Sequence, residues 1–158
     1  MPVPAQLAIT ALMFERNQAM LAKGIDGLAN EQWKARPQDS CNCALWIVGH
    51  IVWARSRTLK LLGVEWSAPW LKFFERGSNH ADAPNYPPAE ELLAAWKETT
   101  ISLPSALASV SPETISAPAP TPSPSLDGTI GGMVSFLALH EGYHIGQIVY
   151  LRKLVADC

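Results

Sequence analysis

Three histidines are the residues in this sequence best suited to carry chemistry. His140 and His144 are four residues apart, and on an α-helix that spacing stacks both side chains on one face with their Cβ atoms about 5–6 Å apart. Both imidazoles can then reach one metal ion. His50 lies in one helical row with Trp46 and Trp53, so we expect it to point towards the same interior. The three residues together predict a site for one divalent cation.

Each histidine taken alone could instead be a core residue that is hydrogen-bonded to a carbonyl or hydroxyl group. Three neutral imidazoles that converge without a metal would each need a separate buried partner, so the set favours a metal. His80, beside Asn79 and Asp82, is expected to be an exposed loop histidine.

Residues 140–144 read HEGYH, which also matches the motif of zinc proteases in which the glutamate is the general base. Those enzymes take a third ligand downstream of this helix, and the 14 residues after His144 contain neither His nor Glu. We therefore disfavour a protease. Glu141 lies beside the ligand row, and we expect it to be exposed or to support a ligand.

A site with three histidines and no protein carboxylate keeps at least one open position, which is typical of catalytic rather than structural zinc. A bound cation can lower the pKa of water, stabilise a thiolate or polarise a carbonyl, so hydrolysis and thiol-dependent transfer both remain open. Imidazole suits several ions, and Ni, Zn, Fe and Co are all candidates. Because the imidazoles must be neutral to bind, we expect loading to fall below about pH 6.

The same helical spacing predicts which side chains surround the metal. Trp46 and Trp53 flank His50, and Tyr143 and Gln147 lie beside the pair in the last helix. Tyr143 or Gln147 could orient a ligand or a substrate, whereas the two tryptophans could equally be simple core packing. Arg57 could bind an anionic substrate group or be a solvated side chain.

The elements that must position these residues are helices. Four segments have helical periodicity and none alternates like a strand, which predicts an all-α four-helix bundle. The expected helices run from about Pro4 to Leu28, from Ser40 or Asn42 to Gly63, from Pro88 to near Thr100, and from Asp127 or Thr129 to about Val155. We expect Pro104 to kink or end the third of these.

Packing and connections follow from the same pattern. The first helix should turn Ile9, Met13 and Met20 inward, with Asn17 near the same stripe. The connector 64–87 is long for a bundle, which indicates a crossover that lets the second and third helices run parallel. The proline-rich segment 116–125 is expected to be an extended linker before the last helix, within a single domain that spans residues 1–158.

Composition limits the functions that remain. Hydrophobic residues make up 48% of the chain and include six tryptophans, while charged residues make up only 16%, which indicates a substantial core. A net charge of −2 without basic clusters favours neither nucleic acid nor a membrane as a partner.

The chain is also expected to be cytoplasmic. The longest uncharged stretch, Ser40 to Ala54, is about 15 residues and too short to span a membrane. No basic region precedes the apolar stretch near the N-terminus, as a secretory signal would require. Cys41, Cys43 and Cys158 are expected to be free thiols.

Three stretches resemble the DinB-like (DinB/YfiT-type) superfamily of metal-binding four-helix bundles: LWIVGHIVWARSRTLKLLG, FFERGS followed by NYPPAEELLAAWKE, and HEGYHIGQIVYLRKL. The resemblance implies a long crossover between the second and third helices, one divalent ion per chain held by His50, His140 and His144, and often a homodimer. Gln147 takes the place of the glutamine that follows the family's second helical histidine. Some members of the superfamily resemble thiol-dependent transferases or isomerases that use a low-molecular-weight thiol.

Two functions remain open at this point. The first is a metalloenzyme of hydrolase or thiol-transferase type that acts on a small molecule, including a low-molecular-weight thiol. The second is a non-catalytic metal-stabilised bundle or small-molecule binding module.

Overall fold

The computed structural model describes residues 2–78, 80–122 and 124–155. Four long helices form its frame: α1 (Ala8–Ile25), α3 (Ala44–Leu61), α4 (Ala89–Ser109) and α6 (Ile130–Leu154). Five short elements connect them: η1 (Ala5–Leu7), α2 (Asn30–Lys34), η2 (Leu71–Phe74), η3 (His80–Asn85) and α5 (Pro112–Ser116). The described ranges contain no strand beyond one isolated bridge between Pro118 and Thr129, which confirms the predicted all-α bundle.

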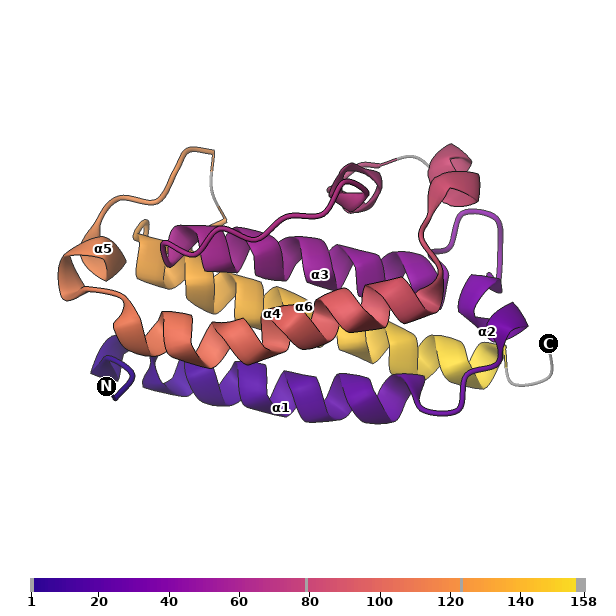
Figure 1. Cartoon of the computed structure of the whole chain (residues 1–158), viewed down its shortest axis with the longest axis horizontal. Coiled ribbons are helices and arrows are strands. Elements are labelled where there is room, and N and C mark those ends of the chain that lie inside the picture. The colour runs from indigo at the N-terminus through magenta and orange to yellow at the C-terminus, as the bar shows by residue number, and fades with distance from the viewer. Residues whose placement is uncertain (1, 79, 123, 156–158) are drawn as a thin grey trace.

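The long helices lie side by side, and two of them run in the opposite direction to the other two. α1 and α6 run one way along the bundle, and α3 and α4 run the other way (Figure 1). Because α3 and α4 are parallel, the chain between them must return along the whole bundle, and η2 packs against α3 on that path. The crossover predicted for residues 64–87 is therefore present.

Two helix ends agree with local sequence chemistry. Thr129 caps α6 by accepting a hydrogen bond from the backbone N–H of Gly132 at 3.0 Å, and Gly63 follows α3 with a φ of 82°, a conformation that favours glycine. The start of α3 was predicted wrongly. It begins after Cys43, which makes no side-chain cap, rather than after Ser40 or Asn42.

The helix end expected near Thr100 is absent, and α4 continues through Pro104 to Ser109. Proline removes one backbone donor from a helix, but Pro104 itself is exposed while Leu103, Ala106 and Leu107 around it are buried. We infer that burial of this apolar face holds the helix together across the missing hydrogen bond.

The inward face of α1 also differs from the expectation. Ile9 and Met20 are 69% and 51% exposed, and the buried row instead includes Thr10, Phe14 and Asn17. The two polar members are satisfied on α6: Thr10 Oγ1 is 2.7 Å from Ser135 Oγ, and Asn17 Nδ2 donates to the Ala138 carbonyl at 2.8 Å. Hydrophobic periodicity missed Thr10 because it treats polar residues as outward-facing, whereas Asn17 was expected near the inward stripe.

Aromatic residues from α2, α3 and the crossover fill the core at the end of the bundle where α3 begins. The large buried side chains there are Trp33, Trp46, Trp70 and Phe74. Among the helices that the structure describes, none combines the length and apolar character needed to cross a bilayer.

Candidate metal centre

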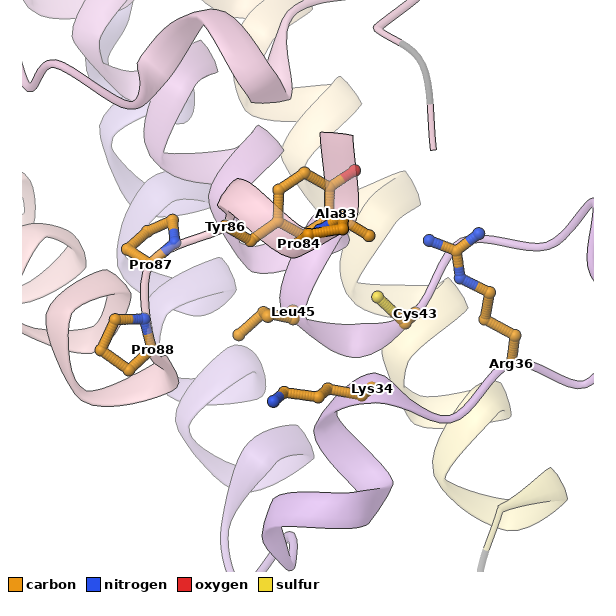
Figure 2. A pocket seen from close by; sticks show the side chains of 9 residues that line it. All are labelled: Lys34, Arg36, Cys43, Leu45, Ala83, Pro84, Tyr86, Pro87 and Pro88. Atoms are coloured by element: carbon orange, nitrogen blue, oxygen red, sulfur yellow. The ribbon is translucent and has the colours of Figure 1, made fainter. Parts of the chain in front are cut away.

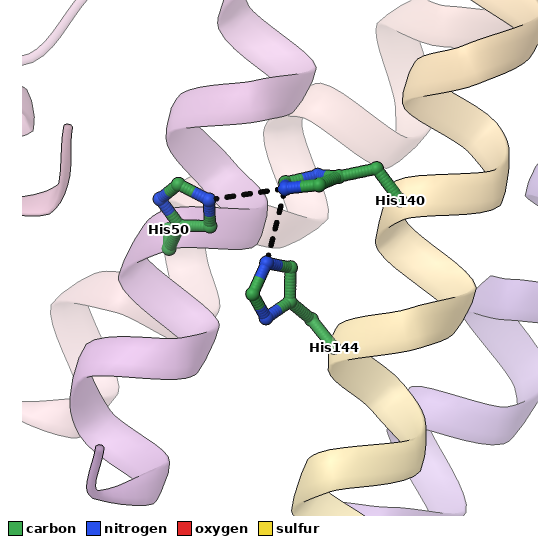
Figure 3. Close-up of side chains that lie close together, drawn as sticks. All are labelled: His50, His140 and His144. Atoms are coloured by element: carbon green, nitrogen blue, oxygen red, sulfur yellow. Dashed lines mark hydrogen bonds between the residues drawn. The ribbon is translucent and has the colours of Figure 1, made fainter. Parts of the chain in front are cut away.

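The three histidines meet between α3 and α6. Figure 3 shows His50 on α3 facing His140 and His144, which lie one turn apart on α6. The Nε2 atom of His140 is 3.3 Å from that of His50 and 3.0 Å from that of His144. One ligand atom from each residue lies within 4.8 Å of the other two, so the set could hold a metal ion.

Two of the rings are oriented by hydrogen bonds on their far side. His50 Nδ1 is 2.6 Å from the Phe74 carbonyl oxygen, and His144 Nδ1 is 2.7 Å from Gln147 Oε1. Each of these oxygens is an acceptor, so each Nδ1 must be the donor and must carry the proton. The Nε2 lone pairs of His50 and His144 therefore point towards the shared centre.

His140 completes the centre in a way that fits a cation. Its Nδ1 is buried without a hydrogen-bond partner among the described residues, while its Nε2 faces the other two Nε2 atoms. A single proton on His140 Nε2 could satisfy only one of those two lone pairs and would leave a buried Nδ1 lone pair. A metal would accept the Nε2 lone pairs of all three rings, and the proton of His140 would then lie on Nδ1, which faces no partner among the described residues. Nitrogens about 2.0–2.1 Å from zinc at tetrahedral angles lie roughly 3.3 Å apart.

Burial keeps the imidazoles neutral, which is the form that binds a metal. Burial lowers the pKa of His50 from 6.5 to about 4, although the Phe74 carbonyl opposes this shift. The pKa of His140 also falls to about 4, through burial first and then through the nearby His144, His50 and Arg76. Burial lowers the pKa of His144 as well, while Gln147 raises it.

Aromatic rings surround the centre. Trp46 and Trp53 both stack on His50, with ring centroids 4.7 Å and 5.1 Å away, and Phe136 stacks on His140 at 5.9 Å. Trp46 Nε1 also donates to Ser78 Oγ at 3.0 Å, which ties the crossover to the site. The two tryptophans therefore contact a candidate ligand directly, in addition to packing in the core.

Tyr143 and Gln147 form a polar pair beside His144. Gln147 Nε2 donates to the hydroxyl oxygen of Tyr143 at 3.3 Å while its Oε1 receives the His144 proton. Tyr143 is 65% exposed, so its ring lies at the surface next to the centre.

Glycine allows the crossover to reach His50. A Cβ atom at Gly49 would overlap the Phe74 ring, so only glycine lets that ring lie this close to α3 beside the candidate ligand. Sequence reasoning did not identify Phe74, because the acceptor is a backbone carbonyl. The FFERGS segment that contains Phe74 was the available signal.

Two arginines lie near the centre. Arg57 is exposed and its guanidinium lies 5.3 Å from the centroid of Trp53, the ring that stacks on His50. Arg76 is close enough to His140 to contribute to the lowering of its pKa. No carboxylate joins the three histidines as a potential ligand among the described residues.

Glu141 is buried, which excludes exposure, the first of the two alternatives expected for it. Both of its oxygens accept hydrogen bonds from Arg55 at 2.8 Å. This arrangement does not suit a general base at the histidine centre, so it supports the argument against a zinc protease.

The cysteines lie apart from the histidines. Cys41 and Cys43 are free thiols, and Cys158 falls outside the described residues, as does the side chain of His80. Cys43 lines a separate cavity of about 600 Å³ together with Lys34, Arg36 and Tyr86 (Figure 2). Neither described cysteine belongs to the potential ligand set.

Comparison with known proteins places the chain in a family. No curated protein matches the sequence. A family model described as the DinB superfamily matches residues 13–148, a range that contains all three histidines, the whole of α3 and most of α6. With most of its length matched, this chain belongs to the DinB superfamily.

Proposed function

We propose that this chain binds one divalent metal ion per chain through the Nε2 atoms of His50, His140 and His144, and that the loaded site is a metalloenzyme for a small substrate. The observation that carries the proposal is the convergence of three Nε2 atoms from two helices within 4.8 Å. The hydrogen bonds that hold the protons of His50 and His144 on Nδ1, and membership of the DinB superfamily, support it. Ni, Zn, Fe and Co are the candidate ions.

The reaction is proposed to be of hydrolase or thiol-dependent transferase type. A bound cation would supply Lewis-acid chemistry, because it lowers the pKa of water or a thiol and polarises a carbonyl. The residues of the chain would hold that ion between aromatic walls, and Gln147 would keep His144 in the neutral tautomer that binds. Arg57 and Arg76 near the site support an anionic substrate, including a thiol that reaches the ion as a thiolate.

We also propose that the chain forms a homodimer. Large apolar side chains are exposed along one face of α6, at Leu139, Tyr143, Tyr150 and Leu154. Their spacing of about one or two turns aligns them in one stripe, and a second copy could cover it.

The test combines metal content with turnover. Elemental analysis should find close to one metal per chain in the wild type and little in His50→Ala or His140→Ala, while His80→Ala serves as the control and should retain the metal. Equal metal content in the wild type and both site variants would reject metal binding by these residues. The loaded and stripped proteins would then be assayed with esters and with thiol-dependent substrates. Metal-dependent turnover would support an enzyme, whereas binding of such ligands without turnover would favour a non-catalytic binding module.

A further inference from the structure

A buried ion pair joins the two helices that carry the histidines. Arg55 on α3 and Glu141 on α6 are each 1% exposed, and Arg55 donates from Nε and Nη2 to the two carboxylate oxygens at 2.8 Å each. Arg55 also donates from Nη1 to Thr100 Oγ1 on α4, and its guanidinium lies 5.8 Å from the centroid of Trp96. Both charged groups are therefore held in one geometry by three helices.

The ion pair is close to the histidine centre along both chains. Glu141 directly follows His140, and Arg55 comes five residues after His50, which is about 7.5 Å along the helix axis. α3 and α6 are thus connected at two places, once where His50 meets His140 and once at the ion pair. Any axial slide of one helix past the other would disturb both contacts together.

Stability alone is a weak explanation for such a pair. Two charges lose much of their hydration when they are buried, and replacing a buried ion pair by apolar residues of similar size is often neutral or stabilising. A bidentate guanidinium–carboxylate contact does add directional specificity, because it tolerates little displacement of either group.

We infer that Arg55 and Glu141 are positioning residues of the metal centre, an inference that rests on the proposed metal-binding function. Their ion pair sets the axial register of α3 against α6 and keeps Nε2 of His50 within reach of an ion held by His140 and His144. Neither residue touches the ion, so both act through the backbone positions of the histidines.

The test uses Co²⁺ as the probe with the full-length chain. In the double variant Arg55→Met/Glu141→Leu, two apolar side chains replace the buried charges. We expect the metal-free variant to melt at or near the wild-type temperature, yet to bind Co²⁺ about 10–100-fold more weakly and with a changed visible absorption spectrum. The matched control Lys60→Met/Lys153→Leu alters exposed residues on the same two helices and should bind Co²⁺ as the wild type does.

A second variant keeps the test decisive if the double variant does not fold. Arg55→Lys retains the charge but loses the bidentate geometry. We expect this variant to fold, to bind Co²⁺ more weakly and to show an altered visible absorption spectrum. Wild-type affinity and an unchanged spectrum in every folded variant would overturn the inference while leaving metal binding intact. If the wild type itself binds no Co²⁺, the proposed function fails and the positioning role fails with it.

Discussion

At the scale of single residues, the candidate ligands differ in the hydrogen-bond partner of Nδ1, the ring nitrogen that does not face the centre. His50 and His144 have acceptors at Nδ1, the Phe74 carbonyl and the Gln147 side chain, whereas the Nδ1 of His140 has none among the described residues. Partners of this kind fix the tautomer and the ring orientation of a ligand. They should therefore affect metal affinity without being ligands themselves.

Gln147→Leu is expected to weaken metal affinity by about 10–100-fold, because His144 loses the acceptor that holds its proton on Nδ1. Tyr143→Phe is the matched control, since it removes only the hydroxyl that Gln147 contacts from its other end, and its effect should be much smaller. Calorimetric titration of each stripped protein with Zn²⁺ measures both. Identical affinities for Gln147→Leu and the wild type would contradict this role.

The pH dependence should follow from the lowered histidine pKa values. His50 and His140 have a pKa of about 4 in the folded chain, against 6.5 ordinarily, so the unfolded chain binds more protons between these values. The free energy of unfolding of the metal-free protein should therefore decrease as pH falls from 6.5 towards 4.

For the same reason, the metal should stay bound at a lower pH than the ordinary histidine pKa suggests. We expect the ion to be retained at about pH 5.5 and lost as the pH approaches about 4. Elemental analysis after equilibration at each pH, with circular dichroism to check folding, provides the measurement. Loss of most of the metal near about pH 6.5 from a folded protein would contradict the pKa argument.

At the scale of elements, the centre depends on how closely the crossover lies against α3. The Phe74 ring occupies the space that a side chain at position 49 would need. The same approach brings the Phe74 carbonyl to His50. A change at Gly49 should therefore act on both packing and the orientation of a ligand.

Gly49→Ala should lower the free energy of unfolding by about 1–3 kcal/mol, because an added methyl group overpacks a filled site. It should also weaken metal binding by displacing Phe74. Gly146→Ala is the matched control on α6, where a Cβ meets nothing within 4 Å; it should stabilise the helix by about 0.5–1 kcal/mol. Urea unfolding of both variants measures the change in the free energy of unfolding. A neutral or stabilising Gly49→Ala would show that the contact between Phe74 and α3 is loose.

Helical periodicity predicted the four long helices and placed His140 and His144 on one face, because both are properties of one helix at a time. The crossover was predicted from the length of residues 64–87, and the approach of His50 from its row with Trp46 and Trp53 and from the family resemblance. These patterns did not predict the buried ion pair, since charged residues are normally read as exposed and only tertiary packing shows that Arg55 reaches Glu141. The continuation of α4 through Pro104 likewise depends on burial of neighbouring residues.

At the scale of the whole molecule, the bundle leaves one face of α6 without cover. Leu139 and Tyr150 on this face are 53% and 65% exposed. Exposed apolar patches on otherwise well-packed proteins commonly mark interaction sites. A second copy of the chain is the occupant that we propose.

Leu139→Glu/Tyr150→Glu is expected to raise the dimer dissociation constant by about tenfold or more, because two apolar side chains would lose burial on association. Ile101→Glu is the control, since Ile101 is equally exposed at 67% but belongs to α4. Light scattering after size-exclusion chromatography gives the mass. A wild type that elutes as a monomer at all concentrations would reject the dimer.

A crystal structure of the metal-loaded protein with anomalous data would locate the ion itself. We expect one anomalous peak within about 2.0–2.2 Å of the Nε2 atoms of His50, His140 and His144, with an exogenous ligand completing the coordination. A peak bound elsewhere in the chain, or three imidazoles that turn apart while the fold is preserved, would contradict this expectation.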